Sequence, residues 1–220
     1  MKNDLIEEMY LTKENSYFSL EREMFKNAIK EKNKSILDIG CGTGVLGLYF
    51  RTNQNCNVFG IEINNAAYLE AKKNLDDVIK GNVETLDIPY ENNKFDYIVM
   101  GDVLEHLINP MGTINKIIKL LKPGGKILIT VPNVSHWSIL ISLIFKDKWK
   151  YESWGLLDYT HLRFFTKKSL HEMLNDSGFN LVKSSRVIQK KSKSSFFNFF
   201  TFGFFSGFLA SHTFITITKE

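Results

Sequence analysis

Residues 36–47 read Ile-Leu-Asp-Ile-Gly-Cys-Gly-Thr-Gly-Val-Leu-Gly, and this stretch decides the fold. It opens with a largely apolar run typical of a buried strand, and a helical pattern begins at Val45. Gly40, Gly42 and Gly44 lie between the two segments. Glycine adopts positive φ easily and lets a backbone approach a ligand closely. The stretch therefore predicts a tight ligand-binding turn between a strand and a helix.

Strand-like and helix-like segments alternate along the rest of the chain. Runs with strand character occupy residues 35–39, 57–63, 78–80, 95–100 and 126–131. Helical spacing occupies residues 16–31, 45–51, 66–75, 111–121 and 167–177, and the Lys-Pro-Gly-Gly of residues 122–125 is expected to stop the fourth of these helices. Residues 179–189 and 211–218 alternate like the two strands of a hairpin. This order predicts an α/β fold whose mainly parallel sheet is covered on both faces.

The length and composition fit one globular domain. Of the 220 residues, 44% are hydrophobic and 24% are charged, which excludes disordered and fibrous chains. The net charge of +4 arises in residues 177–220, where six basic residues face one acidic residue. A basic surface spread over the whole chain is therefore not expected, and we predict no nucleic-acid partner.

The cysteines and the first residues bear on the compartment. Only two cysteines occur, Cys41 and Cys56, and the first lies in the glycine-rich turn, where a disulfide would be awkward. This usage favours a reducing compartment. Residues 1–8 contain no apolar run of the kind found in a secretory signal. We therefore expect a cytoplasmic protein.

An acidic residue follows the glycine-rich turn at the end of the next expected strand. Glu62 ends the expected second strand, 20 residues after Gly42. A carboxylate in this place can accept hydrogen bonds from both ribose hydroxyls, so the turn and Glu62 together predict an adenosine site. The glycine spacing also fits a dinucleotide fingerprint, which leaves a nicotinamide-dependent oxidoreductase as an alternative. The Tyr-x-x-x-Lys pairs that such chemistry needs begin here at Tyr68 and Tyr90, too early to reach a substrate cleft.

Further motifs follow the turn in a characteristic order. Asp38 extends it upstream to Leu-Asp-Ile-Gly-x-Gly-x-Gly, and downstream lie Glu62, Gly81-Asn82, Phe95-Asp-Tyr-Ile-Val, Asp102, Glu105-His106-Leu107 and Leu121-Lys-Pro-Gly-Gly. With this set the sequence resembles the class I S-adenosylmethionine-dependent methyltransferases across most of its length. The resemblance implies S-adenosyl-L-methionine as the cofactor. It also implies a Rossmann-like, seven-stranded, mostly parallel sheet with helices on both faces and an antiparallel C-terminal hairpin.

The resemblance also organises the chain, which we expect to be a single methyltransferase domain over residues 1–220. Its parts would be an N-terminal helical segment (1–33), a cofactor-binding core (34–131), a substrate lid (132–165), and a C-terminal helix and hairpin with a phenylalanine-rich insertion (166–220).

Carried over residue by residue, the resemblance implies a set of cofactor-binding positions. These are Tyr17, Arg22, Asp38, Gly40, Cys41, Gly42, Gly44, Glu62, Ile63, Asn82, Val83, Asp102 and Val103. Tyr17 and Arg22 would reach the methionine carboxylate, and Glu62 would bind the ribose. The family more often has aspartate at the position of Asn82, where it accepts a hydrogen bond from the adenine amino group. An asparagine carbonyl can still accept this bond.

The candidate catalytic residues are His161, His106 and Arg163. His161 lies in an Asp-x-Thr-His-x-Arg-x-Phe stretch that begins at Asp158 and resembles methyltransferases found with sugar and polysaccharide biosynthesis. We expect His161 to act as a general base or to orient the acceptor, and Arg163 and Asp158 to shape the pocket. The alternative is that His161 caps the following helix.

No metal site is assigned, although one cluster leaves a cation open as an alternative. Asp102, Glu105 and His106 resemble the divalent-metal motif of some class I methyltransferases, with His136 as the later histidine that completes it. Carboxylate and imidazole ligands of this kind could hold Mg²⁺ or Zn²⁺. Metal-free relatives carry the same Glu-His pair.

Two aromatic-rich segments stand outside the common core. One runs from Trp137 through Trp154 in the expected lid, and the other places eight phenylalanines between Ser194 and Ala210, after a cluster of lysines at residues 190–193. Basic residues beside aromatic ones predict a peripheral membrane contact through residues 183–209, at the inner membrane face. Packing of the insertion on the lid, or a homodimer contact, is the alternative. A transmembrane tail is not expected, because residues 211–218 alternate as a strand.

These observations converge on methyl transfer to a small-molecule acceptor. Residues 101–104 read Gly-Asp-Val-Leu where amino-methylating enzymes carry an Asn-Pro-Pro-Tyr motif, which favours O-methylation of a hydroxyl. The expected acceptor is a sugar or a lipid-linked or hydrophobic compound. A non-catalytic module that binds adenosylmethionine and engages a membrane or a partner remains a further alternative.

Overall fold

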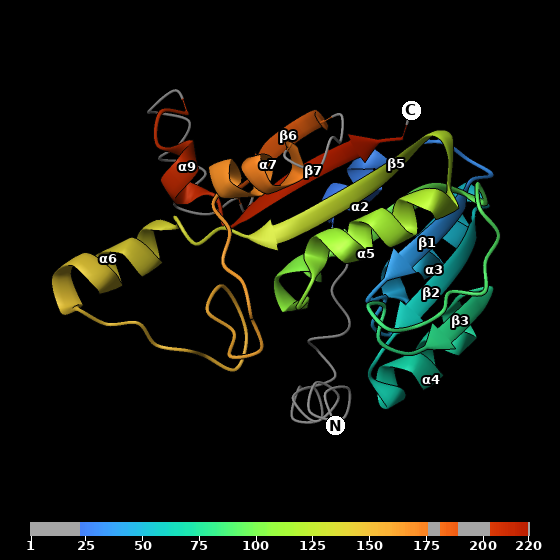
Figure 1. Cartoon of the computed structure of the whole chain (residues 1–220), viewed down its shortest axis with the longest axis horizontal. Helices are drawn as coiled ribbons and strands as arrows, with labels where there is room; N and C mark the ends of the chain where they lie inside the picture. Colours follow the sequence, from blue (N-terminus) through green and yellow to red (C-terminus); the bar gives the residue numbers. More distant parts are fainter. Residues whose placement is uncertain (1–22, 176–180, 189–202, 220) are drawn as a thin grey trace.

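A computed structural model describes residues 23–175, 181–188 and 203–219 of the chain (Figure 1). Its strands are β1 (Ser35–Ile39), β2 (Asn57–Glu62), β3 (Asp77–Lys80), β4 (Phe95–Gly101), β5 (Leu121–Pro132), β6 (Leu181–Val187) and β7 (His212–Thr218). Its helices are α2 (Glu23–Ala28), α3 (Val45–Gln54), α4 (Asn65–Asn74), α5 (Pro110–Ile117), α6 (Trp137–Lys146), α7 (Lys167–Asn175) and α9 (Ser206–Leu209), with the 3-10 turns η2 (Leu104–His106) and η3 (Ile118–Leu120).

The strands form one seven-stranded sheet in the order β3-β2-β1-β4-β5-β7-β6. Neighbours from β3 through β5 pair in parallel, whereas β7 is antiparallel to both β5 and β6. The predicted fold class is confirmed. The chain reverses direction across the sheet between β1 and β4, and ligands of open α/β sheets bind at the carboxyl ends of the strands beside such a switch point.

Alternation along the strands builds an apolar core on each face of the sheet. Leu37 and Ile39 of β1 pack on one face with Ile114 of α5 and Leu170 of α7. Ile36 packs on the other face with residues of α2, α3 and α4, among them Phe25, Phe50 and Ala71. Strand side chains point alternately to the two faces, so the central strands are buried on both sides. This double burial explains why they read as nearly continuous apolar runs.

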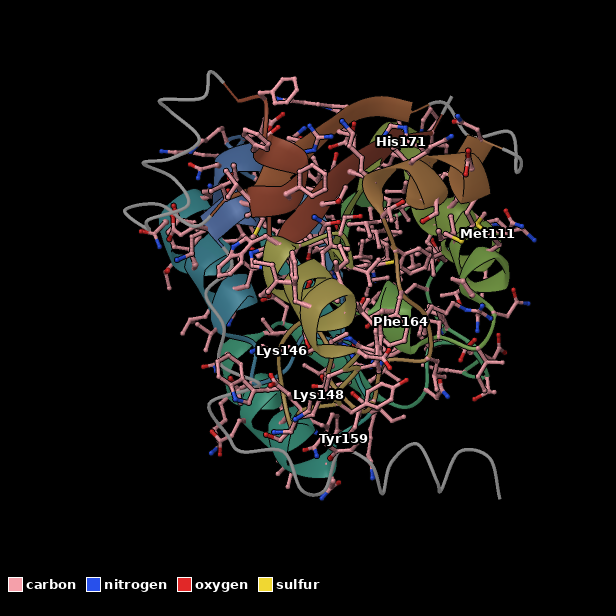
Figure 2. The ribbon with its side chains drawn as sticks, turned by 90° about the vertical axis from the view of Figure 1, so that its left-hand side faces the viewer. Met111, Lys146, Lys148, Tyr159, Phe164 and His171 are labelled. Atoms are coloured by element: carbon pink, nitrogen blue, oxygen red, sulfur yellow. The ribbon has the colours of Figure 1, made fainter. Side chains whose placement is uncertain are left out.

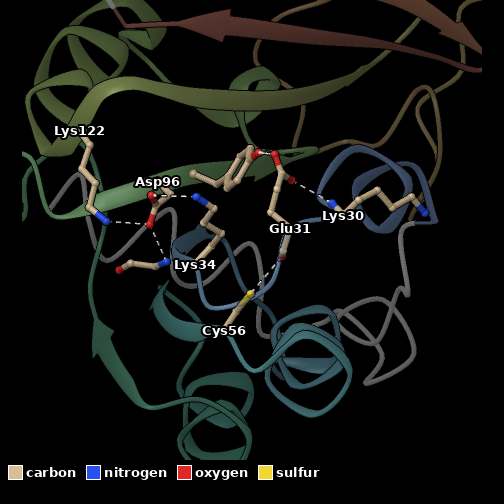
Figure 3. Close-up of polar contacts among 8 residues, drawn as sticks. Lys30, Glu31, Lys34, Cys56, Asp96 and Lys122 are labelled. Carbon is tan, nitrogen blue, oxygen red and sulfur yellow. Dashed lines mark hydrogen bonds and ion pairs between the residues drawn. The ribbon is translucent and has the colours of Figure 1, made fainter.

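The amino-terminal ends of the central strands are held by an ion network (Figure 3). The carboxylate of Asp96 contacts Nζ of Lys122 at 2.8 Å and Nζ of Lys34 at 3.7 Å, and it accepts the backbone N–H of Ser35 at 2.9 Å. Burial alone would raise the pKa of Asp96, but these contacts outweigh it and lower the pKa. The network joins the starts of β1, β4 and β5 at the end of the sheet opposite the glycine-rich turn.

One expectation about local structure is wrong. Residues 122–125 do not separate a helix from a strand, because β5 begins at Leu121 and includes them. Gly124 N–H donates to Lys219 O, and Lys219 N–H donates to Gly125 O, each at 2.9 Å, so the C-terminal strand region pairs with this turn. The expected lid also contains a helix, α6, that the sequence pattern did not indicate.

Several predictions concern residues that the structure does not describe. Tyr17, Arg22 and residues 16–22 of the helix expected at residues 16–31 lie outside the described ranges, and the described remainder of that segment contains α2. The same holds for the lysines at residues 190–193 and for the insertion up to residue 202. Within the described parts of the chain, no helix has both the length and the apolar character needed to cross a membrane.

Candidate active site

The glycine-rich turn lies between β1 and α3, where backbone geometry requires glycine. Gly40, Gly42 and Gly44 have φ values of 67°, 56° and 78°, a region that side chains disfavour. Gly40 donates its N–H to Ile61 O at 2.8 Å, which joins the turn to the end of β2. A Cβ on Gly40 would lie 2.6 Å from Cγ2 of Val103. The turn is thus a narrow cradle that a single methyl group would begin to fill, and this fits the close approach of a cofactor.

Glu62 supports the turn from the end of β2. Its Oε2 accepts the backbone N–H of Gly42, and its Oε1 accepts that of Asn64, each at 2.8 Å. The residue is only 4% exposed. Each carboxylate oxygen can accept a second hydrogen bond, so the geometry is compatible with the predicted ribose contact. The contact to Gly42 gives Glu62 a structural role that the sequence did not reveal.

The expected adenine side follows β2 and β3. Ile63 is half-buried directly after β2, and Val83 belongs to the core on the face of the sheet that packs against α5. The Oδ1 of Asn82 accepts the backbone N–H of Glu84 at 2.9 Å, which closes a local turn. Asparagine therefore shapes the loop after β3, and its expected contact with an adenine amino group stays a prediction.

Asp102 and Val103 follow β4 at the same end of the sheet. Asp102 has a φ of 55°, and its Oδ1 accepts from the hydroxyl of Thr130 at 2.9 Å. Nε2 of His212 lies 3.7 Å from the same carboxylate oxygen. Sequence reasoning missed Thr130 and His212, because pairing of β4 with β5 brings Thr130 to Asp102, and pairing of β5 with β7 brings His212 there. Asp38, also expected at this site, is 3% exposed on β1.

A second cluster brings together Glu105, His106 and His161. The rings of His106 and His161 meet edge to face with centroids 4.8 Å apart, and Nε2 of His161 lies 3.8 Å from Oε1 of Glu105. Glu105 is 1% exposed and His161 is 8% exposed. Val103 O accepts the backbone N–H of His106 at 3.0 Å, so the cluster is contiguous with the residue that packs against Gly40.

The protonation state of His106 follows from its surroundings. Its Nδ1 lies 3.0 Å from Thr160 O, and a carbonyl can only accept, so Nδ1 carries the proton and Nε2 the lone pair. Burial lowers the pKa of His106 to about 4, with a further lowering from His161. His106 is therefore a neutral imidazole at neutral pH.

Asp158 makes its described side-chain contacts within its own chain segment, whereas Arg163 contacts a segment distant in the sequence. Oδ1 of Asp158 accepts the hydroxyl of Thr160 at 2.7 Å and its backbone N–H at 2.9 Å. Arg163 donates from Nε to Leu107 O at 3.1 Å and from a terminal nitrogen to Ile108 O. The bonds of Asp158 close a turn just before His161, and those of Arg163 hold the segment of His161 against the segment of His106. These contacts fit positioning roles for both residues.

The alternative metal cluster does not assemble as expected. In the described ranges, the ligand atoms of Glu105, His106 and His161 lie within 4.8 Å of one another, and this group includes neither Asp102 nor His136. His136 instead caps α6, because its side chain accepts the backbone N–H of Ser138. The histidine that joins Glu105 and His106 is His161.

Comparison with known proteins identifies the family. A family model described as a methyltransferase domain matches residues 13–184. The chain belongs to this methyltransferase family. Its cofactor is S-adenosylmethionine, and the match decides against the nicotinamide alternative.

Individual relatives extend this finding. The demethylmenaquinone methyltransferase of Oceanobacillus iheyensis is 27% identical over 77% of this chain and 82% of its own length. The ubiquinone biosynthesis O-methyltransferase of Psychrobacter arcticus is 30% identical over 66% of this methyltransferase, which spans 59% of that protein's length. A solved S-adenosylmethionine-dependent methyltransferase from Archaeoglobus fulgidus shares the fold, with a TM-score of 0.68 at 18% identity over 98% of this chain and 99% of that chain.

Proposed function

We propose that the protein transfers a methyl group from S-adenosylmethionine to a hydroxyl of a small hydrophobic acceptor, with His161 as the general base. The observation that carries the proposal is the placement of the buried pair of His161 and Glu105 directly beyond Val103, which packs against the glycine-rich turn. Cofactor and acceptor groups would then meet at one end of the sheet.

The proposed reaction requires little covalent chemistry from the protein itself. When bound, the cofactor supplies a sulfonium-activated methyl group, and its thioether departs as the acceptor oxygen forms the new bond to carbon. With the Nε2 proton of His161 directed toward Glu105, Nδ1 of His161 accepts the hydroxyl proton. The Glu105 carboxylate, 3.8 Å from the ring, stabilises the resulting imidazolium. Positioning and exclusion of water supply the rest.

The cofactor site is tested by calorimetric titration with S-adenosylmethionine, S-adenosylhomocysteine and NADH. We expect adenosyl binding by the unaltered protein, and an affinity about 5- to 150-fold weaker in Glu62→Ala, because loss of a ribose contact costs about 1–3 kcal/mol. Glu70→Ala is the matched control, since Glu70 is exposed on α4 and pairs only with Lys73 among the described contacts. Binding of NADH alone, or equal affinities in Glu62→Ala and Glu70→Ala, would contradict the proposed site.

Two relatives support a hydrophobic acceptor. Their names refer to demethylmenaquinone and to an O-methyltransferase of ubiquinone biosynthesis. Quinone-related hydroxyls and lipid-linked sugars both combine a hydroxyl-bearing ring with an apolar chain. We therefore place such compounds first in a screen for methylated product. Turnover with any of them would also exclude a module that binds the cofactor without catalysis.

A divalent cation bound by Glu105, His106 and His161 is a second candidate for activating the hydroxyl. Two imidazoles and a carboxylate within 4.8 Å form a ligand set suited to Zn²⁺. The cation would lower the pKa of a coordinated hydroxyl, which would remove the need for a histidine base. Turnover that survives exhaustive chelation would exclude this candidate and retain His161 as the base.

A further inference from the structure

Helix α6 leaves most of its apolar side chains uncovered. Among its residues only Ile139 is buried, whereas Ile144 and Phe145 are 72% and 78% exposed. Trp137, Ile141 and Leu143 are also exposed. A helix that is apolar around most of its circumference is normally covered by other structure, and a large exposed apolar patch marks an interaction site. Figure 1 shows that α6 projects away from the sheet.

Lysines alternate with aromatic residues where α6 ends. The chain continues Lys146-Asp-Lys-Trp-Lys-Tyr-Glu over residues 146–152, and all seven residues are exposed. Three lysines against two acids leave this segment a formal charge of +1. Figure 2 shows Lys146 and Lys148 near the end of α6, on the side of the molecule where Tyr159 and Phe164 also lie. Lysine stems can lie along an apolar layer while their ammonium groups reach phosphates, and tryptophan and tyrosine favour the same boundary.

A second apolar element faces the same end of the molecule. Phe204, Phe205 and Phe208, in and before α9, are 83%, 38% and 48% exposed. The side-chain nitrogen of Asn133 donates to Gly207 O and to Ala210 O at 2.9 Å each, which ties α9 to the segment that leads into α6. Figures 1 and 2 both place α6 and α9 on this end. Both helices thus lie at one end of the molecule, and each carries exposed apolar residues.

A series of aromatic rings connects this region with the candidate reaction centre. The ring of His161 lies 6.2 Å from that of Phe164, and Phe164 lies 5.1 Å from Trp149. Tyr151 lies 6.2 Å from Phe164 and 6.3 Å from Trp149. The series thus begins at a buried histidine and ends at residues adjoining the lysines after α6.

We propose that α6 rests on an anionic lipid surface and that the acceptor is a lipid drawn from that surface. Its hydroxyl-bearing head reaches His161 past Phe164, while its apolar chain stays in the bilayer. The ten residues of α6 span about 15 Å, roughly half of the ~30 Å hydrocarbon layer, so the helix lies along the surface. The choice of a lipid over a second copy rests on the lysines beside the apolar face, which complement phosphate groups. The identity of the acceptor rests on the proposed function, whereas lipid binding does not.

The lipid surface is tested by co-sedimentation with vesicles of phosphatidylcholine containing phosphatidylglycerol, and with vesicles of phosphatidylcholine alone. The full chain should bind the anionic vesicles at least tenfold more tightly than the neutral ones. The double variant Ile144→Glu/Phe145→Glu should lose at least tenfold of this affinity. Leu69→Glu is the matched control, because Leu69 is a 52% exposed apolar residue on α4, and it should bind as the unaltered protein does.

Two results would overturn the lipid surface. One is equal binding of vesicles by the double variant and by Leu69→Glu. The other is a dimer in sedimentation velocity that fails to bind vesicles and becomes monomeric in the double variant, which would show that a second copy covers α6.

A separate measurement distinguishes this inference from the proposed function. The double variant should bind S-adenosylmethionine with unchanged affinity, and it should methylate a short-chain, water-soluble acceptor at the unaltered rate while losing at least tenfold on the same head group embedded in vesicles. Equal loss on both acceptors would overturn the lipid route. Failure of the unaltered protein to bind S-adenosylmethionine would instead overturn the proposed function and leave vesicle binding to be judged alone.

Discussion

We call residues 34–131 the cofactor-binding half of this methyltransferase and residues 132–165 its acceptor half, following the expected division of the chain. The two halves differ in how far their key residues are buried. In the first, Glu62 is 4% exposed and holds the glycine-rich turn through backbone hydrogen bonds at the end of a parallel sheet. In the second, residues 132–165 include helix α6, on which Phe145 is 78% exposed. Backbone geometry thus shapes the turn where we expect the cofactor, whereas the expected acceptor half presents exposed apolar surface. We therefore expect the first half to carry the chemistry shared by the family and the second half to determine acceptor choice.

Two glycine substitutions, one in each half, should separate these roles most strongly. Gly40→Ala places a Cβ 2.6 Å from Val103 at a φ of 67°, so we expect a loss of roughly 2–5 kcal/mol of stability from strain and overpacking. Because the turn must move, affinity for S-adenosylmethionine should fall about 100-fold. Urea unfolding and calorimetry measure the two effects.

Gly155→Ala is the matched change in the acceptor half. Gly155 has a φ of 95°, but a Cβ there would meet nothing within 4 Å. The variant should therefore lose only about 1–2 kcal/mol from backbone strain and keep its affinity for the cofactor. Equal cofactor affinities in Gly40→Ala and Gly155→Ala would show that the glycine-rich turn does not contact the cofactor.

The same contrast explains how much the sequence could predict. The strand at residues 35–39 has the predicted bounds, and Glu62 lies at the end of the next strand as expected. Both predictions succeed because a buried strand followed by glycines leaves the backbone few alternatives. In contrast, every position of α6 from Ile139 to Ile141 and from Leu143 to Phe145 is apolar, so no helical period is visible and the helix was missed.

Contacts between residues that lie far apart in the sequence account for the remaining failures of prediction. His106 and His161 are 55 residues apart, and their ring contact depends on the bonds of Arg163 to the loop after η2. No local pattern encodes such a contact, so the sequence marked both histidines as candidates without pairing them. The turn at residues 121–125 shows the opposite error. Its proline and glycines predict an interruption, but backbone bonds with Lys219 supply the pairing that keeps it within β5.

Removal of the His161 ring should affect catalysis and spare the cofactor half. His161→Ala should lower kcat about 100-fold, because general base catalysis typically contributes 10²- to 10⁴-fold, while affinity for S-adenosylmethionine stays within twofold of the unaltered value. His171→Ala on α7 is the matched control. Steady-state kinetics with an identified acceptor, combined with calorimetry, gives both quantities. Full turnover by His161→Ala would remove His161 from the mechanism.

The smallest expected effect is a pH dependence of stability that arises at the contact between the two halves, where the ring of His106 meets that of His161. Burial lowers the pKa of His106 to about 4, whereas an unfolded histidine has a pKa near 6.5. Between these values the unfolded chain binds more protons, so the free energy of unfolding rises with pH. The stability is fully present above about pH 6.5 and is lost as the pH falls toward 4, by about 2 kcal/mol at pH 4.5.

A variant that keeps the hydrogen bond but cannot titrate isolates this effect. His106→Asn retains an N–H that can donate to Thr160 O, the carbonyl that Nδ1 of His106 contacts at 3.0 Å. The free energy of unfolding of both proteins is measured in urea at pH 7 and at pH 4.5. Carboxylates that titrate over this interval contribute equally to both proteins, so their contribution cancels in the comparison. The unaltered protein should lose about 2 kcal/mol more than the variant over this interval. Equal losses would mean that His106 is as accessible to protons in the folded protein as in the unfolded chain. The contact between His106 and His161 would then be open to water, and the closed environment that the proposed methyl transfer requires would have to form only after the acceptor binds.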